Sequence, residues 1–176
     1  HRRSRAGDGD GDGDGDGDDE AQLATARAFV AEVAAISQVS AHPNCTGFVA
    51  AALDLPDLAI VMEYVDGGPL KTKMFSPHPA ERFASDSARV NALLDVARGM
   101  AYLHARGMLH RDLKPDNILI EAATQTAKIA DFGLSAFALP HDEHNAVTGG
   151  TRAYMAPEVL AGREQDPPAD VFSFGV

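Results

Sequence analysis

Apolar residues recur at helical spacing near the start of the chain. From about Ala21 to Ser40, an alanine-rich segment places Phe29, Val33 and Ile36 on one face, as in a helix that packs against a core. The following His42-Pro43-Asn44 should end this helix, because proline disfavours helical backbone in the residue before it.

Two apolar runs after this helix predict a pair of β-strands. Phe48 to Leu53 and Leu58 to Val65 flank Asp54-Leu55-Pro56-Asp57, in which aspartate and proline favour a turn. Asp66-Gly67-Gly68-Pro69 should end the second strand, because glycine and proline interrupt regular structure. A loose polar stretch is then expected up to Ser85.

A second helix is predicted from Asp86 to Arg106, and Gly107 is well placed to end it. The apolar face of this helix is expected to consist of Val90, Leu93, Ala97 and Met100. Short strands are predicted at Ile118 to Ile120 and at Ala127 to Ala130. The chain should therefore combine two long helices with short strands and charged loops.

The negative charge of the chain is concentrated near its start. The net charge is −11, but eight acidic residues and no basic one lie between Asp8 and Glu20, which leaves −3 for the rest. The Gly-Asp repeat from Gly7 to Asp19 has nothing to bury, so residues 1–20 are expected to be disordered. A calcium loop fits less well, because its last ligand should be glutamate and the run has Asp19 there. A G-x-G-x-x-G phosphate loop does not fit, because the glycines occupy only odd positions.

The remaining composition excludes several classes of protein. Apolar residues make up 45% of the chain, which is typical of a globular protein. No apolar run approaches the ~18 residues of a membrane span, and no signal peptide is expected. Cys45 is the single cysteine, so neither an internal disulfide nor a multi-cysteine zinc site can form. A nucleic-acid partner is not expected, because no basic stripe with interleaved aromatic residues is present.

Chemically active residue types are densest in His110-Arg111-Asp112-Leu113-Lys114-Pro115-Asp116-Asn117, which Asp131-Phe132-Gly133 follows after a short interval. Two carboxylates, an ammonium group and an amide oxygen can converge from these two loops. They are contributed by Asp112, Lys114, Asn117 and Asp131. Hard oxygens suit Mg²⁺, a cation suits a transferring phosphoryl group, and a carboxylate suits an acceptor hydroxyl. Each residue alone is better explained as a loop cap or a surface charge, but their order and spacing together favour phosphoryl transfer.

These motifs resemble the catalytic loop and metal-binding motif of eukaryotic protein kinases, and the likeness runs from about Ala21 to Val176. The resemblance implies that Asp112 is the catalytic base and that Lys114 steadies the γ-phosphate of ATP. It also implies that Asn117 and Asp131 hold Mg²⁺.

The residues after the metal-binding motif extend the resemblance. Gly150-Thr151-Arg152-Ala153-Tyr154-Met155-Ala156-Pro157-Glu158 is similar to the end of a Ser/Thr-kinase activation segment, which small-molecule phosphotransferases lack. Thr151 would then bond to the catalytic aspartate and lysine, and Asp170 would anchor the backbone of the catalytic loop. Arg111 implies pairing with a phosphorylated activation segment, for which Thr148 is a better candidate than Ser135.

The upstream strand is similar to the last strand of a kinase small lobe, with a hinge near residues 63–68. The resemblance implies that Met62 is the gatekeeper and that the backbones of Glu63 and Val65 pair with adenine. Leu119 is also expected at the nucleotide. A plain buried strand is an alternative that is compatible with these roles.

The first predicted helix carries two further correspondences. Glu32 falls where the family keeps a glutamate that pairs with a lysine, although a solvated glutamate on the helix face is the alternative. An apolar regulatory spine is implied at Ile36, Phe48, His110 and Phe132.

The chain also departs from the kinase pattern. It has no lysine before Lys71 and no glycine-rich loop, and it stops at Val176 inside the expected central helix of the large lobe. An incomplete kinase domain, inactive by itself, is therefore expected. The order of motifs around Glu32, His42-Pro43-Asn44 and Ala97 to His104 is similar to the tyrosine-kinase-like branch, whose members are mostly Ser/Thr-specific.

Taken with this resemblance, the sequence predicts an α+β, two-lobed fold, with a disordered segment at 1–20 and a partial kinase domain at 21–176. Part of a β-sheet lobe with one helix should precede part of a mostly helical lobe. The expected function is Mg²⁺- and ATP-dependent phosphorylation of Ser or Thr on proteins. The alternative is a non-catalytic interaction module, which the absent lysine favours. A cytoplasmic location is expected, or the intracellular side if the parent protein is membrane-anchored.

Overall fold

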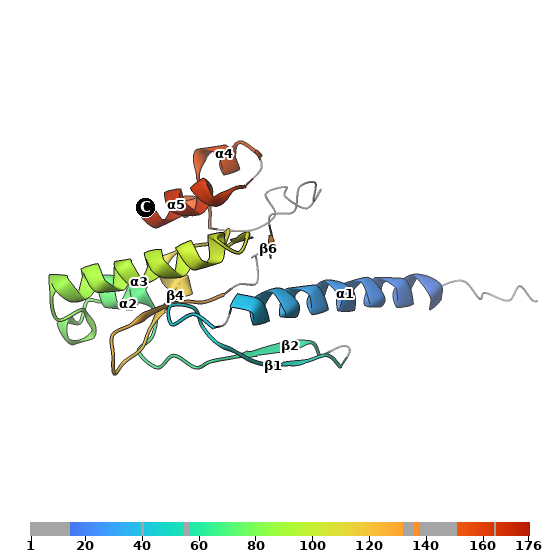
Figure 1. Cartoon of the computed structure of the whole chain (residues 1–176), viewed down its shortest axis with the longest axis horizontal. Helices are drawn as coiled ribbons and strands as arrows, with labels where there is room; N and C mark the ends of the chain where they lie inside the picture. Colours follow the sequence, from blue (N-terminus) through green and yellow to red (C-terminus); the bar gives the residue numbers. More distant parts are fainter. Residues whose placement is uncertain (1–14, 40, 55–56, 132–135, 138–150, 164) are drawn as a thin grey trace, which may run out of the picture.

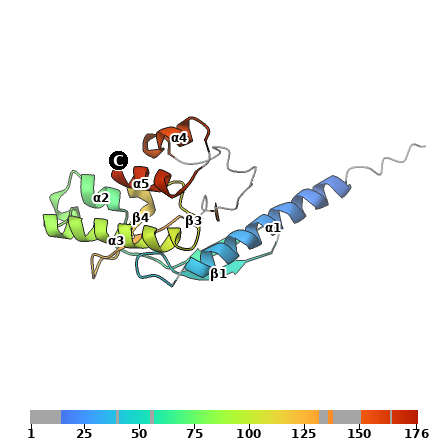
Figure 2. The same cartoon turned by 45° about the horizontal axis from the view of Figure 1, so that its top comes forward.

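The computed structural model describes residues 15–39, 41–54, 57–131, 136–137, 151–163 and 165–176. Helices and two-stranded antiparallel sheets make up these residues, which confirms the expected α+β class. A long N-terminal helix, α1 (Gly15–Val39), lies beside a β-hairpin on one side of the molecule, and the remaining helices lie on the other side (Figures 1 and 2). None of the helices found in these ranges is long and apolar enough to cross a membrane.

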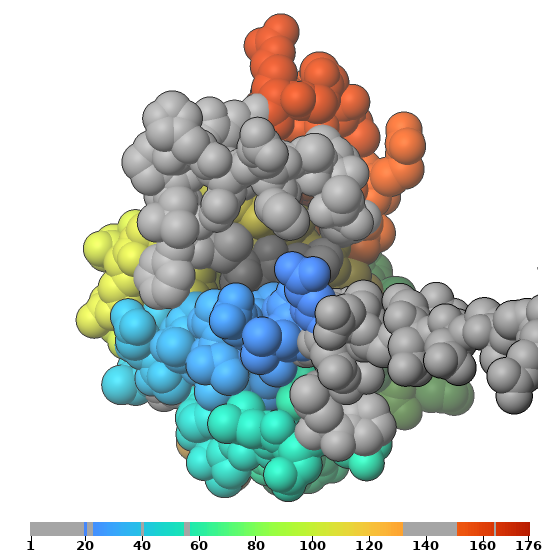
Figure 3. All heavy atoms as spheres, turned by 90° about the vertical axis from the view of Figure 1, so that its right-hand side faces the viewer, coloured from blue at the N-terminus to red at the C-terminus, as the bar shows by residue number. Residues whose placement is uncertain are grey.

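The hairpin consists of β1 (Phe48–Ala52) and β2 (Ala59–Met62). The strands pair antiparallel from Phe48 opposite Met62 to Ala52 opposite Ala59, with an irregularity between Phe48 and Ala50. Both strands lie within the predicted apolar runs, although β2 ends at Met62 rather than at Val65. The turn residues 55–56 lie outside the described residues. Helix α1 packs against β1, as Figure 3 shows from the end of the helix.

Helix α1 begins at Gly15, earlier than the expected start near Ala21. The prediction of disorder up to residue 20 is therefore wrong for residues 15–20, and residues 1–14 lie outside the described part of the chain. The sequence there is acidic, and acidic residues near a helix N-terminus interact favourably with the helix dipole. The helix ends at Val39, just before His42-Pro43-Asn44, as the proline predicts.

The larger part of the molecule is built around α3 (Asp86–His104), close to its predicted range. Two small sheets accompany it. They are β3 (Met108–Leu109) with β6 (Ala136–Phe137), and β4 (Ile118–Ile120) with β5 (Ala127–Ile129). The C-terminal helices are α4 (Pro157–Leu160) and α5 (Pro167–Gly175).

One helix was not expected from the sequence. The stretch predicted to be loose contains α2 (Leu70–Phe75) and a 3₁₀ turn at Pro79–Glu81. Helix α2 is too short for apolar periodicity to reveal it. Its first residue, Leu70, is buried, so tertiary contacts rather than local propensity hold the helix in place.

Helix α3 buries a different face from the one predicted. Val90 is 54% exposed and Leu93 is 40% exposed, and of the predicted face only Met100 is buried. The buried face consists of Ala92, Val96, Gly99, Met100 and Leu103. Small residues on this face let α3 approach β5 closely. A Cβ atom at Gly99 would lie 2.6 Å from Ile129 Cδ1 and 2.7 Å from the Asn44 carbonyl oxygen.

The segment after α1 is tied to β5, the strand that leads to Asp131. The Ile129 N–H donates to the Asn44 carbonyl at 2.9 Å, and the Thr46 N–H donates to the Ile129 carbonyl at 2.8 Å. Asn44 also donates from its side chain to the Ala127 carbonyl at 3.0 Å. These bonds join α1, the hairpin and β5 around one apolar core, and they fix the position of Asp131, which follows β5.

The segment after β2 is held against β4 by a close backbone contact. The Ile120 N–H donates to the Gly68 carbonyl at 2.8 Å, and a Cβ atom at Gly67 would lie 2.2 Å from the Ile120 carbonyl oxygen. Asp66 accepts a hydrogen bond from the Ala122 N–H at 2.9 Å. Glycine at position 67 therefore permits an approach that any side chain would prevent.

Candidate active site

The Asp112 carboxylate lies at the centre of a hydrogen-bond network on the loop after β3. Lys114 Nζ donates to Asp112 Oδ2 at 2.5 Å and to Thr151 Oγ1 at 2.8 Å. The Thr151 N–H donates to Asp112 Oδ1 at 2.7 Å. The expected contacts of Thr151 with Asp112 and Lys114 are thus confirmed, and they dock the segment that begins at Thr151 onto the loop.

Burial favours the neutral form of Asp112 and works to raise its pKa. Hydrogen bonds from Lys114 and from the Thr151 backbone and side chain outweigh this effect, so the pKa of Asp112 lies below its ordinary value. The carboxylate is therefore ionised near neutral pH. An ionised carboxylate can accept a hydrogen bond from an acceptor hydroxyl and orient it.

Asn117 binds the same carboxylate through its side-chain amide. Its side-chain Nδ2 donates to the Asp112 carbonyl at 2.9 Å and to Asp112 Oδ2 at 3.1 Å. Both bonds use the amide nitrogen, so the amide oxygen is directed away from them. The Ala130 N–H donates to the Asn117 carbonyl at 2.9 Å, which brings the residue before Asp131 next to Asn117.

Asn117 and Asp131 can therefore offer an amide oxygen and a carboxylate from adjacent strand ends. These hard oxygen donors are the ligand types that Mg²⁺ prefers, so the residues present fit the expected metal. Asp131 has a positive φ of 61°. This backbone conformation is uncommon for residues other than glycine, and such strain clusters at functional sites.

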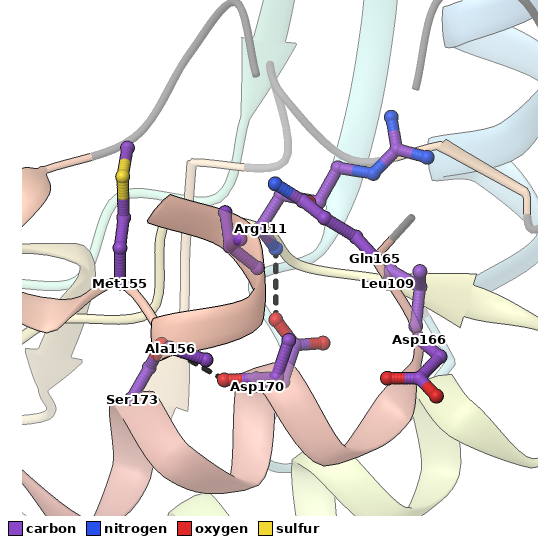
Figure 4. A pocket seen from close by; sticks show the side chains of 10 residues that line it. Leu109, Arg111, Met155, Ala156, Gln165, Asp166, Asp170 and Ser173 are labelled. Atoms are coloured by element: carbon purple, nitrogen blue, oxygen red, sulfur yellow. Dashed lines mark hydrogen bonds between the residues drawn. The ribbon is translucent and has the colours of Figure 1, made fainter. Parts of the chain in front are cut away.

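Asp170 of α5 anchors the backbone of the catalytic loop. Asp170 Oδ2 accepts from the His110 N–H at 2.9 Å. Oδ1 accepts from the Arg111 N–H at 2.9 Å (Figure 4). The predicted anchoring role of Asp170 is confirmed. Arg111 has a positive φ of 66°, so the Asp170 carboxylate holds the loop in a strained conformation directly before Asp112.

His104 of α3 completes this anchor. His104 Nε2 lies 2.9 Å from Asp170 Oδ2, so the nitrogen must carry the proton that it donates to the carboxylate. Burial works to raise the pKa of Asp170, but the bonds from His104, His110 and Arg111 prevail, and the pKa is lowered. This role of His104 was not predicted from the sequence.

His110 is fully buried, and its environment defines one protonation state. The Asp112 N–H donates to His110 Nδ1 at 3.3 Å, so this nitrogen is unprotonated. Nε2 therefore carries the hydrogen and donates to the Ala130 carbonyl at 3.1 Å. Burial lowers the pKa of His110, in agreement with a neutral ring. The ring thus links the Asp112 loop to the residue before Asp131.

The predicted spine is partly visible. Ile36 and His110 are buried, and Phe48 packs against the core, whereas Phe132 lies outside the described residues. The activation-segment candidates Ser135 and Thr148 also lie outside them, so both stay predictions.

Glu32 lies on α1 within electrostatic range of Asp131. Burial raises the pKa of Glu32, and the negative charge of Asp131 raises it further. Burial and the negative charge of Asp131 thus both favour the neutral form of Glu32. The chain has no lysine before Lys71, so a lysine preceding this helix cannot come from these residues.

Met62 ends β2, and Glu63 begins the predicted hinge. Glu63 accepts a hydrogen bond from the Gly47 N–H at 2.9 Å and one from Lys128 Nζ of β5. The Lys128 bond is the main cause of a lowered Glu63 pKa. Lys128 was not predicted from the sequence, and no pattern there marks it as a partner of Glu63.

The backbone groups expected to contact adenine are available. The Glu63 N–H donates to the Gly47 carbonyl at 2.7 Å, but the Glu63 carbonyl and the Val65 N–H make no hydrogen bond within the described ranges. Pro69 forms a bridge with Leu119, which places the end of the hinge over β4. The roles of Met62, Glu63, Val65 and Leu119 in nucleotide binding stay predictions.

A small hollow lies behind the catalytic loop, between Arg111 and α5 (Figure 4). Leu109, Met155, Val159, Gln165 and Asp170 line it together with Arg111. Asp112, Lys114 and Asn117 are not among its lining residues, so this hollow is separate from the group of side chains suited to phosphoryl transfer.

The fold and site are those of a protein kinase. The family model described as "Protein kinase domain" matches residues 16–176, and the chain belongs to this family.

Individual relatives agree with this assignment. The chain is 35% identical over 153 residues to mitogen-activated protein kinase kinase kinase 7 of Homo sapiens, across 85% of this chain and 24% of that protein. It is 37% identical over 150 residues to the serine/threonine-protein kinase CTR1 of Arabidopsis thaliana, across 84% of this chain and 18% of that protein. It is 38% identical over 142 residues to dual specificity testis-specific protein kinase 1 of Homo sapiens, across 77% and 22% respectively. The chain thus spans about a quarter or less of the relatives that it matches.

Proposed function

We propose that the protein containing this chain transfers the γ-phosphoryl group of ATP to serine or threonine hydroxyls of protein substrates. The observation that carries this proposal is the ionised Asp112 carboxylate, held between Lys114, Thr151 and Asn117. The names of two relatives, a serine/threonine-protein kinase and a dual specificity kinase, support the choice of acceptor.

In this mechanism, Asp112 accepts a hydrogen bond from the acceptor hydroxyl and orients its oxygen toward the γ-phosphorus. A new oxygen–phosphorus bond forms while the bond to the bridging oxygen of ADP breaks, and the hydroxyl proton passes to Asp112. A weakly basic carboxylate suffices, because the transition state of phosphoryl transfer is loose and little proton removal is needed early. Lys114 neutralises negative charge on the transferring group and keeps Asp112 in place.

Asn117 and Asp131 would hold Mg²⁺, as their oxygen donors permit. Bound there, the ion would neutralise phosphate charge. The Glu63 carbonyl and Val65 N–H would bind adenine, with Met62 and Leu119 beside it.

A second function is favoured by one observation. Among the described residues, the charge that shifts the pKa of Glu32 is the negative charge of Asp131, which raises it together with burial. A non-catalytic interaction module built on the kinase fold would also explain this arrangement. Its proposed activity would be partner binding without phosphoryl transfer. For either function we propose a cytoplasmic location.

The deciding experiment compares Asp112→Asn with the unmodified full-length protein, using radiolabelled ATP and a generic protein substrate. Asparagine keeps the size of the side chain, but it has one acceptor oxygen where aspartate has two, and it cannot take the proton. We expect transfer to be abolished while nucleotide affinity, measured by calorimetry, changes little.

Asp86→Asn on α3, whose side chain is 92% exposed, is the matched control for the loss of a carboxylate. An Asp112→Asn variant that keeps most of its turnover would contradict the role of Asp112. Nucleotide-independent partner binding with no transfer by the unmodified protein would favour the interaction module.

A further inference from the structure

An ion pair links α2 to the catalytic loop. Lys71 Nζ donates to Asp116 Oδ1 at 2.9 Å, and the two side chains are 60% and 41% exposed. Lys71 belongs to the first turn of α2, which packs against β4 and against the 3₁₀ turn Pro115–Asn117 (Figure 2). Neither residue has a place in the mechanism above.

Asp116, the acidic partner of this pair, lies on the same loop as the proposed base Asp112. Asp116 is the middle residue of the 3₁₀ turn, and the next residue, Asn117, bonds directly to Asp112. A substrate that presents its hydroxyl to Asp112 must therefore carry its neighbouring side chains past the same loop.

The segment that begins at Thr151 also contacts the catalytic loop. Tyr154 lies in the turn that follows Thr151, and Thr151 itself bonds to Asp112 and Lys114. The pKa of Lys71 is raised chiefly by its hydrogen bond to Asp116, and Tyr154 also contributes. The catalytic loop thus contacts α2 at Asp116 and the segment that begins at Thr151 at Asp112.

The exposure of the pair distinguishes it from the charges of the catalytic network. The side chains of Asp112 and Lys114 are 9% and 20% exposed, and both are held by further bonds to Thr151. The Lys71–Asp116 pair is open to solvent. Because exposed ion pairs contribute little to stability, a charged side chain of another molecule can compete for either partner.

We propose that Lys71 and Asp116 determine charge specificity next to the phosphoacceptor, with Lys71 neutralising a carboxylate that would otherwise select basic substrate residues. This inference rests on the proposed function. The intact pair is close to neutral as a unit, so the protein should discriminate little between basic and uncharged residues at the position nearest Asp116. Removing either partner should leave the other charge to select its opposite.

The test uses full-length protein and serine peptides that carry arginine, glutamate or alanine in turn at each position flanking the serine. For the unmodified protein, we expect kcat/KM for the arginine and alanine peptides to be similar. In Lys71→Met, the arginine peptide should gain about two- to fivefold over the alanine peptide at one flanking position, the range expected for an exposed charge pair. In Asp116→Asn, the glutamate peptide should gain by a similar factor at that position.

Three controls separate charge selection from a structural role. Lys73→Met removes a lysine from the same helix, and Lys73 has no ion-pair partner in the described part of the chain, so the peptide ratios should not change. Lys71→Arg should restore the ratios of the unmodified protein. The double variant Lys71→Met/Asp116→Asn should lose both preferences, because no charge remains to select a substrate residue.

An equal loss of kcat/KM on all peptides in Lys71→Met, with unchanged ratios, would mean that the pair only braces the loop, and it would overturn this inference. Failure of the unmodified protein to phosphorylate even the alanine peptides or a generic protein substrate would instead overturn the proposed function, and this inference with it.

Discussion

Replacing Asp170 with asparagine should weaken the catalytic loop by an amount that the structure allows to be estimated. Oδ2 accepts from His104 and the His110 N–H, and Oδ1 accepts from the Arg111 N–H. Asparagine has one acceptor oxygen. If this oxygen takes the place of Oδ2, the amide nitrogen faces the Arg111 N–H, and that buried donor loses its partner.

Hydrogen bonds to charged groups contribute about 1.5–3 kcal/mol each, and neutral ones about 0.5–1.5 kcal/mol. One bond is lost in Asp170→Asn and two weaken, so we expect a loss of about 2–4 kcal/mol from the free energy of unfolding. At about 2–4 °C per kcal/mol for a domain of 150–250 residues, the melting temperature should fall by about 4–16 °C. The strained Arg111 backbone should also relax, so kcat should fall more than the affinity for nucleotide.

The assay is a thermal melt of the full-length protein, paired with steady-state kinetics. Asp166→Asn is the matched control, because Asp166 is an exposed aspartate at the start of the same helix whose side chain makes no capping hydrogen bond. Equal melting temperatures for the two variants would refute the argument that Asp170 holds the loop through its charge.

Two further predictions concern other parts of the fold. Gly99→Ala should destabilise the protein by about 1–3 kcal/mol through overpacking, because the new Cβ would meet Ile129 and the Asn44 carbonyl. Urea denaturation would test this, with Gly175→Ala as the control, because a Cβ there meets nothing within 4 Å. The Glu63 pKa is lowered from its ordinary 4.5, so the stabilisation from its bond to Lys128 should be complete above pH 4.5 and should decrease as the pH falls through the folded-state pKa. Melts of Glu63→Gln and the unmodified protein should therefore converge as the pH is lowered below 4.5, and a difference that stays constant with pH would contradict the ion pair.

The sequence predicted those parts of the site that depend on short motifs. The contacts of Asp112, Lys114 and Thr151 and the anchoring by Asp170 could be expected, because the motifs that contain these residues resemble those of protein kinases. The pairing of β1 with β2 also followed from local patterning, since each apolar run and the turn between them span only a few positions.

The failures share a physical cause, which is that tertiary contacts override local patterns. The predicted face of α3 followed bulky residues such as Val90 and Leu93, whereas the buried face includes Gly99, whose lack of a side chain permits contact with β5. Periodicity counts bulky apolar residues and gives no weight to a glycine that makes room for a strand. The contacts between Lys128 and Glu63 and between Lys71 and Asp116 join residues far apart in the sequence, so no local signal could reveal them.

The backbone contact at Gly67 limits how the β1–β2 hairpin can rotate relative to the β4–β5 sheet. Glu63 is bound to Gly47 at the hairpin and to Lys128 of β5, while Asp66, Gly67 and Gly68 are held to β4, which pairs with β5, and to the residues after it. Tyr64 and Val65 are left between these two fixed points. Domain rotations are absorbed by a few residues whose backbone dihedral angles can change. Tyr64 and Val65 should therefore absorb any rotation of the hairpin relative to the β4–β5 sheet, and a large rotation would have to break the bond between Lys128 and Glu63.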